Sequence, residues 1–375
     1  MILLLYLDNS ATTPIHQEVK DAMLPFILEQ FGNPSSKYYE QATTAKEAVK
    51  VARSQVAKLI NCNPSEILFT SGSTESNNFV IKGITDQQKT KGRHIITTNV
   101  EHPSVLEVFK FLETLGFEVT ILPVNQEGRI TANQFKDALK PETIFASIQW
   151  GNNELGSLNP IEEIAKISLT NKIFLHSDAT QVIGKIEVNL EEIPGLNSIS
   201  ISAHKFFGPK GVGALFLRKD QYELFPSITP LLHGGGQEEG LRSGTLAVHN
   251  IVGLGKASEI ASKNLTGHID QLNSLESYLV GVLKEKFGSN IKFNQPSSEK
   301  IPGIISVQFI GLNNEILVKR LSPIMAVSTG SACSSAKPSH VLASIGLSLN
   351  EIRQTIRISL SPYIEKDDLN IFKNL

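Results

Sequence analysis

The chain has 375 residues, of which 41% are hydrophobic, and its 35 Lys and Arg nearly balance its 37 Asp and Glu. This length is enough for a large core and one or two domains. The charge balance leaves no basic field that would hold nucleic acid, and no acidic tail occurs. We therefore expect no direct binding of nucleic acid, and a small metabolite is the favoured ligand.

The apolar opening, residues 1–7, has no basic flank and runs directly into Asp8 and Asn9, so it predicts a strand or arm and not a signal peptide. No apolar stretch approaches the length of a membrane span, so no membrane partner is expected. The two cysteines, Cys62 and Cys333, lie far apart, which predicts neither a disulfide framework nor a clustered metal site. A cytoplasmic, reducing compartment is the expectation.

Helical and extended patterns alternate through the middle of the chain. Apolar residues at helical spacing predict a helix over 42–59, which Asn61 and Pro64 end. Thr131 and Gln134 form a capping box for a helix that runs to residue 139. This alternation implies an α/β fold, with a mostly parallel sheet covered by helices on both faces. Strands are expected over 67–70, 94–100, 117–124, 144–150, 173–177 and 198–202, and further helices over 73–84, 104–115 and 161–167.

The regular alternation of strands and helices ends at about residue 255. A long helical segment runs to about residue 287, and it is followed by a strand over 304–309, a helix around 315–321 and an extended run over 357–360. We expect a large domain formed by residues 15–255. Residues 1–14 and 256–375 are expected to form a smaller α+β domain, which the N-terminal arm completes.

Lys205 occupies a position suited to chemistry. Residues 198–202 alternate serine and isoleucine as a strand does, and residues 211–217 predict the strand that returns. A lysine at such a sheet edge, beside His204, can be desolvated enough to lose its proton and form a Schiff base. A lone lysine at a strand end is more often a surface side chain. Its neighbours at the other strand ends favour the chemical role.

Parallel strands bring their carboxyl ends to one edge of a sheet, where α/β proteins bind ligands. The hydroxyl-rich turn 70–76 precedes a helix and can cradle a phosphate. Asp178 can keep a pyridine nitrogen protonated, and His102 can stack on the ring. Gln181 can bond a phenolic oxygen, and Asn152 can face the substrate. Taken singly, each is as readily a turn former or cap, but together with a lysine they match what pyridoxal 5'-phosphate (PLP) requires.

Eight motifs occur in an order that closely resembles the cysteine desulfurases of the NifS and IscS kind. These are fold-type I PLP enzymes of the class V aminotransferase group, and the resemblance runs from residue 6 nearly to the end. The motifs are Thr-Ser-Gly-Ser-Thr-Glu-Ser at 70–76, Glu-His at 101–102, Asn-Asn-Glu-Leu-Gly at 152–156, Asp-Ala-Thr-Gln at 178–181, Ser-Ala-His-Lys at 202–205 with Gly-Pro-Lys-Gly at 208–211, His-Gly-Gly-Gly at 233–236, Arg-Ser-Gly-Thr at 242–245 and Ser-Ala-Cys at 331–333.

The resemblance implies a role for each matching residue. Lys205 is implied as the Schiff-base lysine, Asp178 as the partner of the pyridine nitrogen and Gln181 as that of the phenolic oxygen. His102 is implied as the stacking ring, and it can also carry a proton near the substrate sulfur. The implied contacts to the phosphate are Ser73, Thr74, Ser202 and His204, with Thr245 reaching the phosphate of the neighbouring protomer in a homodimer.

The substrate side of the implied site involves three residues. Asn152 and Arg357 match residues that hold the carboxylate of L-cysteine, for which the planar fork of arginine is suited. Cys333 lies in a run of small residues, about 328–339, which predicts a mobile loop. Free cysteines are more often small buried residues, but this polar setting disfavours that role. The resemblance implies that Cys333 takes the sulfur as a persulfide, leaving L-alanine, and passes it to a protein acceptor.

Several points depart from the family pattern or stay open. The family often has His-Glu-Arg where residues 237–239 read Gln-Glu-Glu, the loop at 336–338 is shorter, and little chain follows residue 362 for docking a scaffold protein. Iron–sulfur cluster assembly, tRNA thiolation and DNA sulfur modification all use such sulfur donors, and no motif chooses among them. A selenocysteine lyase or aminotransferase would share Lys205 and Asp178. A non-catalytic sulfur-carrier or scaffold subunit would keep the fold alone. An esterase is disfavoured because no Gly-x-Ser-x-Gly elbow occurs.

Overall fold

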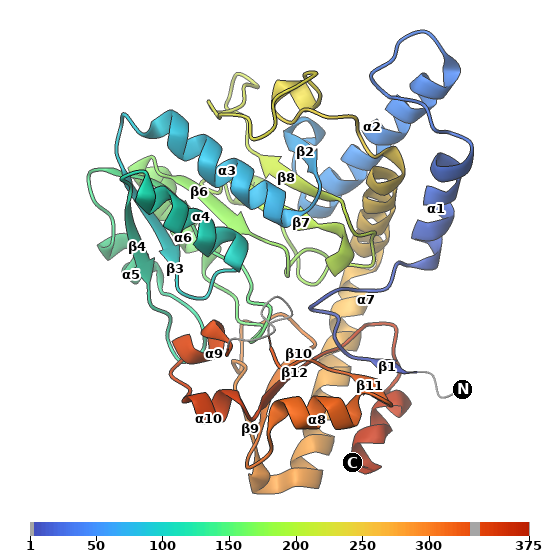
Figure 1. Ribbon diagram of the computed structural model, residues 1–375, viewed down its shortest axis with the longest axis vertical. Coiled ribbons are helices and arrows are strands. Elements are labelled where there is room, and N and C mark those ends of the chain that lie inside the picture. The colour runs from blue at the N-terminus through green and yellow to red at the C-terminus, as the bar shows by residue number, and fades with distance from the viewer. Residues whose placement is uncertain (1–3, 331–337, 375) are drawn as a thin grey trace.

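The computed structural model describes residues 4–330 and 338–374. Its largest sheet has seven strands, of which six are parallel and one, β8, runs antiparallel to both of its neighbours. This is the mostly parallel, helix-covered α/β fold expected from the alternating patterns (Figure 1). In spatial order the strands are β2 (Ile67–Thr70), β8 (Gly213–Leu217), β7 (Ser198–Ser202), β6 (Phe174–Asp178), β5 (Thr143–Ser147), β3 (His94–Thr98) and β4 (Glu118–Leu122).

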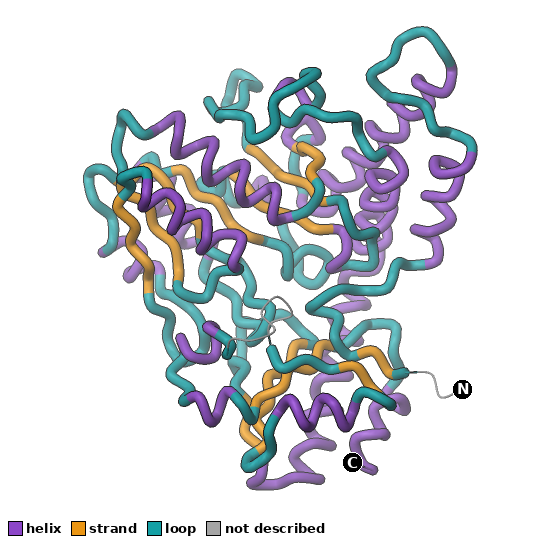
Figure 2. The backbone as a smooth tube through the Cα atoms, viewed as in Figure 1, coloured by secondary structure: helices purple, strands orange, loops and turns teal. Residues whose placement is uncertain are grey.

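Helices cover both faces of this sheet (Figure 2). Successive strand residues point to opposite faces, so Leu68 joins one apolar core while Ile67 and Phe69 join the other. Strands buried on both faces can read as continuous apolar runs, as β2 and β8 do, whereas β7 alternates serine and isoleucine although it is buried throughout. One face packs against α3 (Ser73–Gln88) and α4 (Pro103–Thr114), and the other against α1 (Gln17–Leu28), α2 (Glu40–Ile60), α5 (Ala132–Asp137), α6 (Ile161–Asn171) and the first half of α7 (Val248–Phe287).

Local signals in the sequence placed several helix ends correctly. Asn61 adopts a left-handed conformation, with φ of 48°, and ends α2. Thr131 and Gln134 form the expected capping box at the start of α5. Helix α3 continues to residue 88, beyond the predicted end at residue 84, and helix α1 was not expected from the pattern. Helix α1 is short and packs against α7, and this packing stabilises it. The periodicity of its own sequence does not reveal such a contact.

A second, smaller core lies at the other end of α7 (Figure 1). Its sheet has the antiparallel order β12 (Thr355–Ser359), β10 (Ile304–Phe309) and β9 (Ile291–Phe293). The N-terminal arm contributes β1 (Leu5–Tyr6), which pairs in parallel with β11 (Met325–Ala326). We propose the division into residues 15–255 and residues 1–14 with 256–375 as two domains, with α7 crossing between them. The remaining helices are α8 (Asn314–Leu321), α9 (His340–Ser344) and α10 (Leu349–Ile352).

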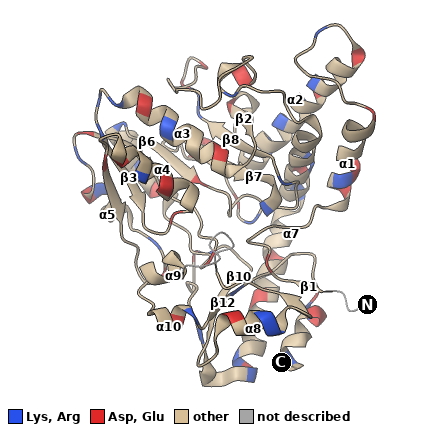
Figure 3. Ribbon diagram, viewed as in Figure 1, with Lys and Arg blue, Asp and Glu red and all other residues tan. Residues whose placement is uncertain are grey.

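The surface is mixed in charge. Lysine and arginine are interspersed with aspartate and glutamate over the helices in the view of Figure 3. Within residues 4–330 and 338–374, no helix combines the length and apolarity that crossing a bilayer requires.

Candidate active site

The carboxyl ends of the parallel strands surround a pocket of about 390 Å³. Its wall includes the residues that follow β2, β3, β6 and β7, together with the N-terminal arm and β12. Most of the predicted site residues therefore meet in one place, as the rule for α/β sheets implies. The predicted residues on the wall are Ser73, Thr74, His102, Asp178, Gln181, Ser202, His204, Lys205 and Arg357.

Lys205 ends a single 3₁₀ turn that follows β7. Its Nζ donates hydrogen bonds to the carbonyl oxygens of Ser10 (2.8 Å) and Ala11 (2.7 Å), both on the N-terminal arm. Thr13 of the same arm holds the turn, because its N–H donates to the carbonyl of His204 and its hydroxyl accepts from the N–H of Phe207. The arm, which is remote in sequence, thus fixes the position of the lysine amine.

The turn before α3 is shaped to approach an anion closely. Gly72 has φ of 150°, a conformation that L side chains rarely adopt. A Cβ at Gly213 would lie only 2.6 Å from the Cα of Gly72, so the start of β8 also requires glycine. The N-terminus of the 16-residue α3 presents N–H groups and the positive end of the helix dipole to the pocket beside Ser73 and Thr74. This is the arrangement in which a phosphate binds.

His204 also lines this pocket. Its Nδ1 lies 3.1 Å from the hydroxyl of Thr12. Burial, reinforced by the charges of Lys205, Lys210 and Lys185, lowers the pKa of His204 to about 4. His204 is therefore neutral near pH 7, and it can offer a hydrogen bond to an anion without carrying charge.

Asp178 ends β6 and receives hydrogen bonds on both carboxylate oxygens. Thr180 donates to Oδ1 from its N–H at 3.0 Å and from its hydroxyl, and Asn77 Nδ2 donates to Oδ2 at 2.9 Å. All three of these groups are donors, and the carboxylate of Asp178 accepts from each of them. A protonated ring nitrogen placed in the pocket would be one more donor to the same group.

His102 is the N-cap of α4. Its Nδ1 accepts from the N–H of Ser104 at 3.1 Å and lies 2.8 Å from the Ser104 hydroxyl. Burial is the main cause that lowers the pKa of His102, and the charges of Lys205 and His340 act in the same direction, against that of Asp178. A neutral ring whose Nδ1 accepts carries its proton on Nε2.

Arg357 on β12 is almost completely buried, with 2% of its side chain exposed. Its Nη2 donates to Asp8 Oδ1 at 2.7 Å and its Nη1 to the carbonyl of Asn153 at 3.1 Å. Its buried Nε has no partner among the described residues. A buried N–H without an acceptor is costly, and a substrate carboxylate is one group that would satisfy it.

The structure does not bring Asn152 to the pocket wall, where its neighbour Asn153 lies instead. The side chain of Asn152 organises its own turn, because Oδ1 accepts from the N–H groups of Glu154 (2.8 Å) and Leu155 (3.0 Å). Its Nδ2 donates to Gln149 Oε1 at 3.2 Å. The role of Asn152 toward cofactor and substrate therefore stays a prediction.

Thr245 is exposed and lies outside the pocket of its own protomer. The loop before it is anchored by Arg242, whose guanidinium donates to both carboxylate oxygens of Glu75 on α3. Reaching a neighbouring protomer stays a prediction for Thr245. Cys333, predicted to take the sulfur, lies outside the described residues.

The unusual residues 237–239 divide into a buried and an exposed part. The carboxylate of Glu238 accepts from the guanidinium of Arg53 at 2.6 and 2.9 Å and from the N–H of Phe69 at 2.7 Å. Glu239 is mostly exposed, with 59% of its side chain accessible. The departure from His-Glu-Arg keeps the central glutamate, and this glutamate supports the strand that leads to the turn before α3.

Sequence reasoning missed a buried network beneath the pocket. Asn77 donates to Ser104 Oγ at 2.9 Å as well as to Asp178, and its Oδ1 accepts from His176 Nε2 at 2.9 Å and from Ser200. Asn77 falls one helical turn after Ser73, on the face of α3 that meets the sheet. The four-residue spacing from Ser73 was the sequence signal that could have placed Asn77 beneath the pocket. It was missed because a polar residue in a helix is usually expected to face solvent.

The donor set and shape of the pocket fit PLP. The wall offers a helix N-terminus with hydroxyl side chains and also a carboxylate, that of Asp178, which can pair with a ring nitrogen. The amine of Lys205 and the ring of His102 line the same pocket. The volume is also in the range of sites for small organic ligands.

The protein family described as aminotransferase class-V matches residues 5–372. A cysteine desulfurase IscS of Dictyoglomus turgidum is 45% identical over 368 residues, which cover 97% of this chain and 91% of that protein. A cysteine desulfurase IscS of Clostridium botulinum is 42% identical over 370 residues, with the same coverage of both chains.

Solved structures agree with this assignment. A NifS-like protein superposes with a TM-score of 0.92 at 37% identity, covering 99% of this chain and 98% of its own. The structure of SspA in complex with cysteine has a TM-score of 0.83 at 37% identity and covers 96% of this chain and 99% of its own. The chain therefore belongs to the aminotransferase class-V family and, within it, to the cysteine desulfurases of the NifS and IscS kind.

Proposed function

We propose that this chain is a PLP-dependent cysteine desulfurase that converts L-cysteine to L-alanine and holds the released sulfur as a persulfide on Cys333. The observation that carries the proposal is the meeting of Lys205, Asp178 and His102 in one pocket, behind a helix N-terminus suited to phosphate. Bound PLP supplies an electron sink for the pair of electrons left on the substrate's α carbon. Asp178 would face the ring nitrogen, and Ser73, Thr74, Ser202 and His204 would hold the phosphate.

Lys205 is proposed to bind the cofactor and to move the α proton. Its amine lies between two carbonyl acceptors of the N-terminal arm, which hold its Nζ at a defined place on the pocket wall. Once the substrate amine has displaced it, the neutral Lys205 amine can remove the proton from the substrate's α carbon. The carbonyls of Ser10 and Ala11 then accept hydrogen bonds from the ammonium group that results.

Arg357 is proposed to hold the substrate carboxylate. Its guanidinium is already oriented by Asp8 and by the carbonyl of Asn153, so little side-chain freedom is lost on binding. The unsatisfied Nε–H gives the carboxylate a direct partner. Asn152, which supports the neighbouring turn, is proposed to assist there and next to the cofactor.

The sulfur step is proposed to occur at Cys333. Its thiolate attacks the substrate sulfur, a bond between the two sulfur atoms forms, and the bond from that sulfur to the substrate's β carbon breaks. The electron pair stays on the β carbon, which takes up a proton to become the methyl group of alanine. Cysteine and one thiol thus yield alanine and one persulfide, with no external oxidant. We propose that His102 carries this proton on Nε2, since its Nδ1 accepts from the N–H of Ser104.

The wider setting is part of the same proposal. We propose a cytoplasmic homodimer in which Thr245 reaches the phosphate of the neighbouring protomer, and a protein acceptor that takes sulfur from Cys333. The acceptor would serve iron–sulfur cluster assembly, tRNA thiolation or DNA sulfur modification. A mixed-charge surface is consistent with a protein partner in place of direct nucleic-acid binding (Figure 3).

The decisive experiment adds L-cysteine to the PLP-loaded protein and measures alanine together with the persulfide on each cysteine. We expect Cys333→Ala to retain the cofactor's absorption and lose the persulfide, and Lys205→Ala to lose alanine formation. Cys62→Ala is the matched control, because burial raises the pKa of the Cys62 thiol and keeps it protonated. Persulfide formation at the normal rate in Cys333→Ala would contradict the proposal.

A further inference from the structure

A chain of hydrogen bonds runs behind the pocket to a lysine that the mechanism does not use. Lys185 Nζ donates to Gln181 Oε1 at 2.9 Å, and Gln181 Nε2 donates to the carbonyl of Ser10 at 2.9 Å. The same carbonyl accepts from Lys205 Nζ at 2.8 Å. Lys185 is thus connected to the catalytic lysine through one carboxamide and one carbonyl group.

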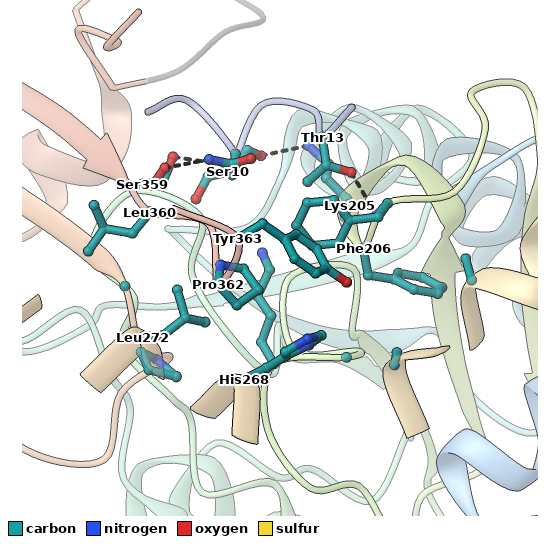
Figure 4. Close-up of a pocket in the computed structure, with 18 of the residues that line it drawn as sticks. Ser10, Thr13, Lys205, Phe206, His268, Leu272, Ser359, Leu360, Pro362 and Tyr363 are labelled. Carbon is teal, nitrogen blue, oxygen red and sulfur yellow. Dashed lines mark hydrogen bonds between the residues drawn. The ribbon is translucent and has the colours of Figure 1, made fainter. Parts of the chain in front are cut away.

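Lys185 lines a second, small cavity of about 30 Å³, which lies beside Lys205 at the junction of the two cores. Figure 4 shows Ser10 and Lys205 along one side of this cavity and Phe206, Leu272 and Tyr363 around it. Burial, followed by the charges of Lys205 and Arg357, lowers the pKa of Lys185 to about 7. Burying an amine costs free energy unless hydrogen bonds replace those it made with water. The bond to Gln181 Oε1 is such a replacement.

The direction of the hydrogen bonds decides which way the Gln181 carboxamide faces. The oxygen and nitrogen ends of a carboxamide have nearly the same shape, so only their partners fix the orientation. Lys185 Nζ donates to Gln181 Oε1, and in its ammonium form, which predominates below pH 7, Lys185 has no acceptor capacity, so the oxygen of Gln181 faces Lys185. The nitrogen then faces Ser10 and the pocket, with one hydrogen on the Ser10 carbonyl and the second available to a ligand.

We propose that Lys185 is a positioning residue that holds the Gln181 carboxamide with its Nε2–H toward the phenolic oxygen of bound PLP. This inference rests on the proposed function, in which Gln181 contacts that oxygen. Without Lys185 the oxygen of Gln181 loses its donor, and only the hydrogen bond from Nε2 to the Ser10 carbonyl still holds this orientation. A larger fraction of the carboxamide then rotates and turns its oxygen toward an ionised phenolic oxygen, where two acceptors repel each other. The hydrogen bond favours the ionised form, so its loss raises the pH at which the cofactor's absorption changes.

The test compares Lys185→Met, Lys185→Arg and the exposed control Lys166→Met in the PLP-loaded protein. Two properties of the cofactor are measured: its dissociation constant and the midpoint of its absorption change with pH. We expect Lys185→Met to weaken PLP binding about tenfold, as loss of one hydrogen bond to a charged group implies, and to raise the midpoint by about one pH unit. Lys185→Arg keeps a donor and should behave as the wild type, as should Lys166→Met.

Thermal unfolding of the cofactor-free protein separates this role from a structural one. The cavity beside Lys185 is lined largely by apolar side chains, so methionine should leave the unfolding temperature unchanged or raise it. A lower unfolding temperature or failure of Lys185→Met to fold would assign the amine to fold stability and overturn the inference. If Lys185→Met bound PLP as tightly as the wild type does, that result would overturn the inference as well. A wild-type protein that takes up no PLP would instead overturn the proposed function.

Discussion

Replacing Asn77 with alanine should remove the hub of the network beneath the active site. Asn77 is completely buried and bonds Asp178, Ser104, His176 and Ser200. His176 and Ser200 can still pair with each other, because their polar atoms lie 3.2 Å apart. Two groups, Asp178 Oδ2 and Ser104 Oγ, would each lose a buried donor. At about 1–3 kcal/mol for each buried group deprived of a partner, the expected loss of stability is about 2–6 kcal/mol.

Thermal unfolding of the cofactor-free protein measures this loss. An unfolding entropy of about 2.1 cal/mol/K per residue corresponds, for 375 residues, to about 0.8 kcal/mol for each degree. The unfolding temperature of Asn77→Ala should therefore fall by about 3–8 °C. Asn78→Ala is the matched control, because Asn78 is the next residue of α3 and bonds only the carbonyl of Thr74 within the described residues. Equal shifts in the two variants would refute the role assigned to the network.

Three further predictions concern the substrate, a buried ion pair and pH. Arg357→Lys should raise the KM for L-cysteine about 10–100-fold in an alanine-formation assay, because lysine cannot reproduce the fork; an unchanged KM would remove Arg357 from substrate binding. Glu238→Gln should lower the free energy of unfolding by about 2–4 kcal/mol, since it leaves a guanidinium uncompensated, and a similar loss in the exposed control Glu239→Gln would contradict this. Burial raises the pKa of Glu101 from 4.5 to about 8, so the protonated carboxyl contributes stability that is fully present below pH 4.5 and lost as pH rises through 8. The wild type should therefore lose stability as pH rises from 5 to 9, whereas Glu101→Gln should not, so the unfolding temperature of the variant should rise relative to that of the wild type. Parallel curves for the two proteins would disprove the shift.

Much of the fold was predictable because it depends on local pattern. Apolar spacing predicted α2, the capping box predicted the start of α5, and alternation with helices predicted a mostly parallel sheet. The strand-end rule then predicted that residues as distant as Ser73 and Lys205 would line one pocket. The resemblance of the motifs supplied the residue roles, which stay predictions until variants are tested.

The partners of these residues could not be predicted, because they depend on contacts between remote segments. Asn152 belongs to a matching motif, yet its carboxamide is committed to its own turn and leaves the pocket wall to Asn153. Arg357 was expected at the substrate, but its pairing with Asp8 joins positions 349 residues apart. Similarly, nothing near Lys185 in the sequence indicates that its amine lies beside Lys205.

The sequence by itself determined the fold class, the location of the site at the strand ends and the chemistry available there, because residue type and short-range periodicity carry those features. Only the tertiary structure decided which groups are ionised, oriented and held. Burial and neighbouring charges set the protonation of His102, His204 and Lys185. The N-terminal arm sets the place of the Lys205 amine. These properties depend on distances of a few ångströms between segments far apart in the chain, and such distances exist only after folding.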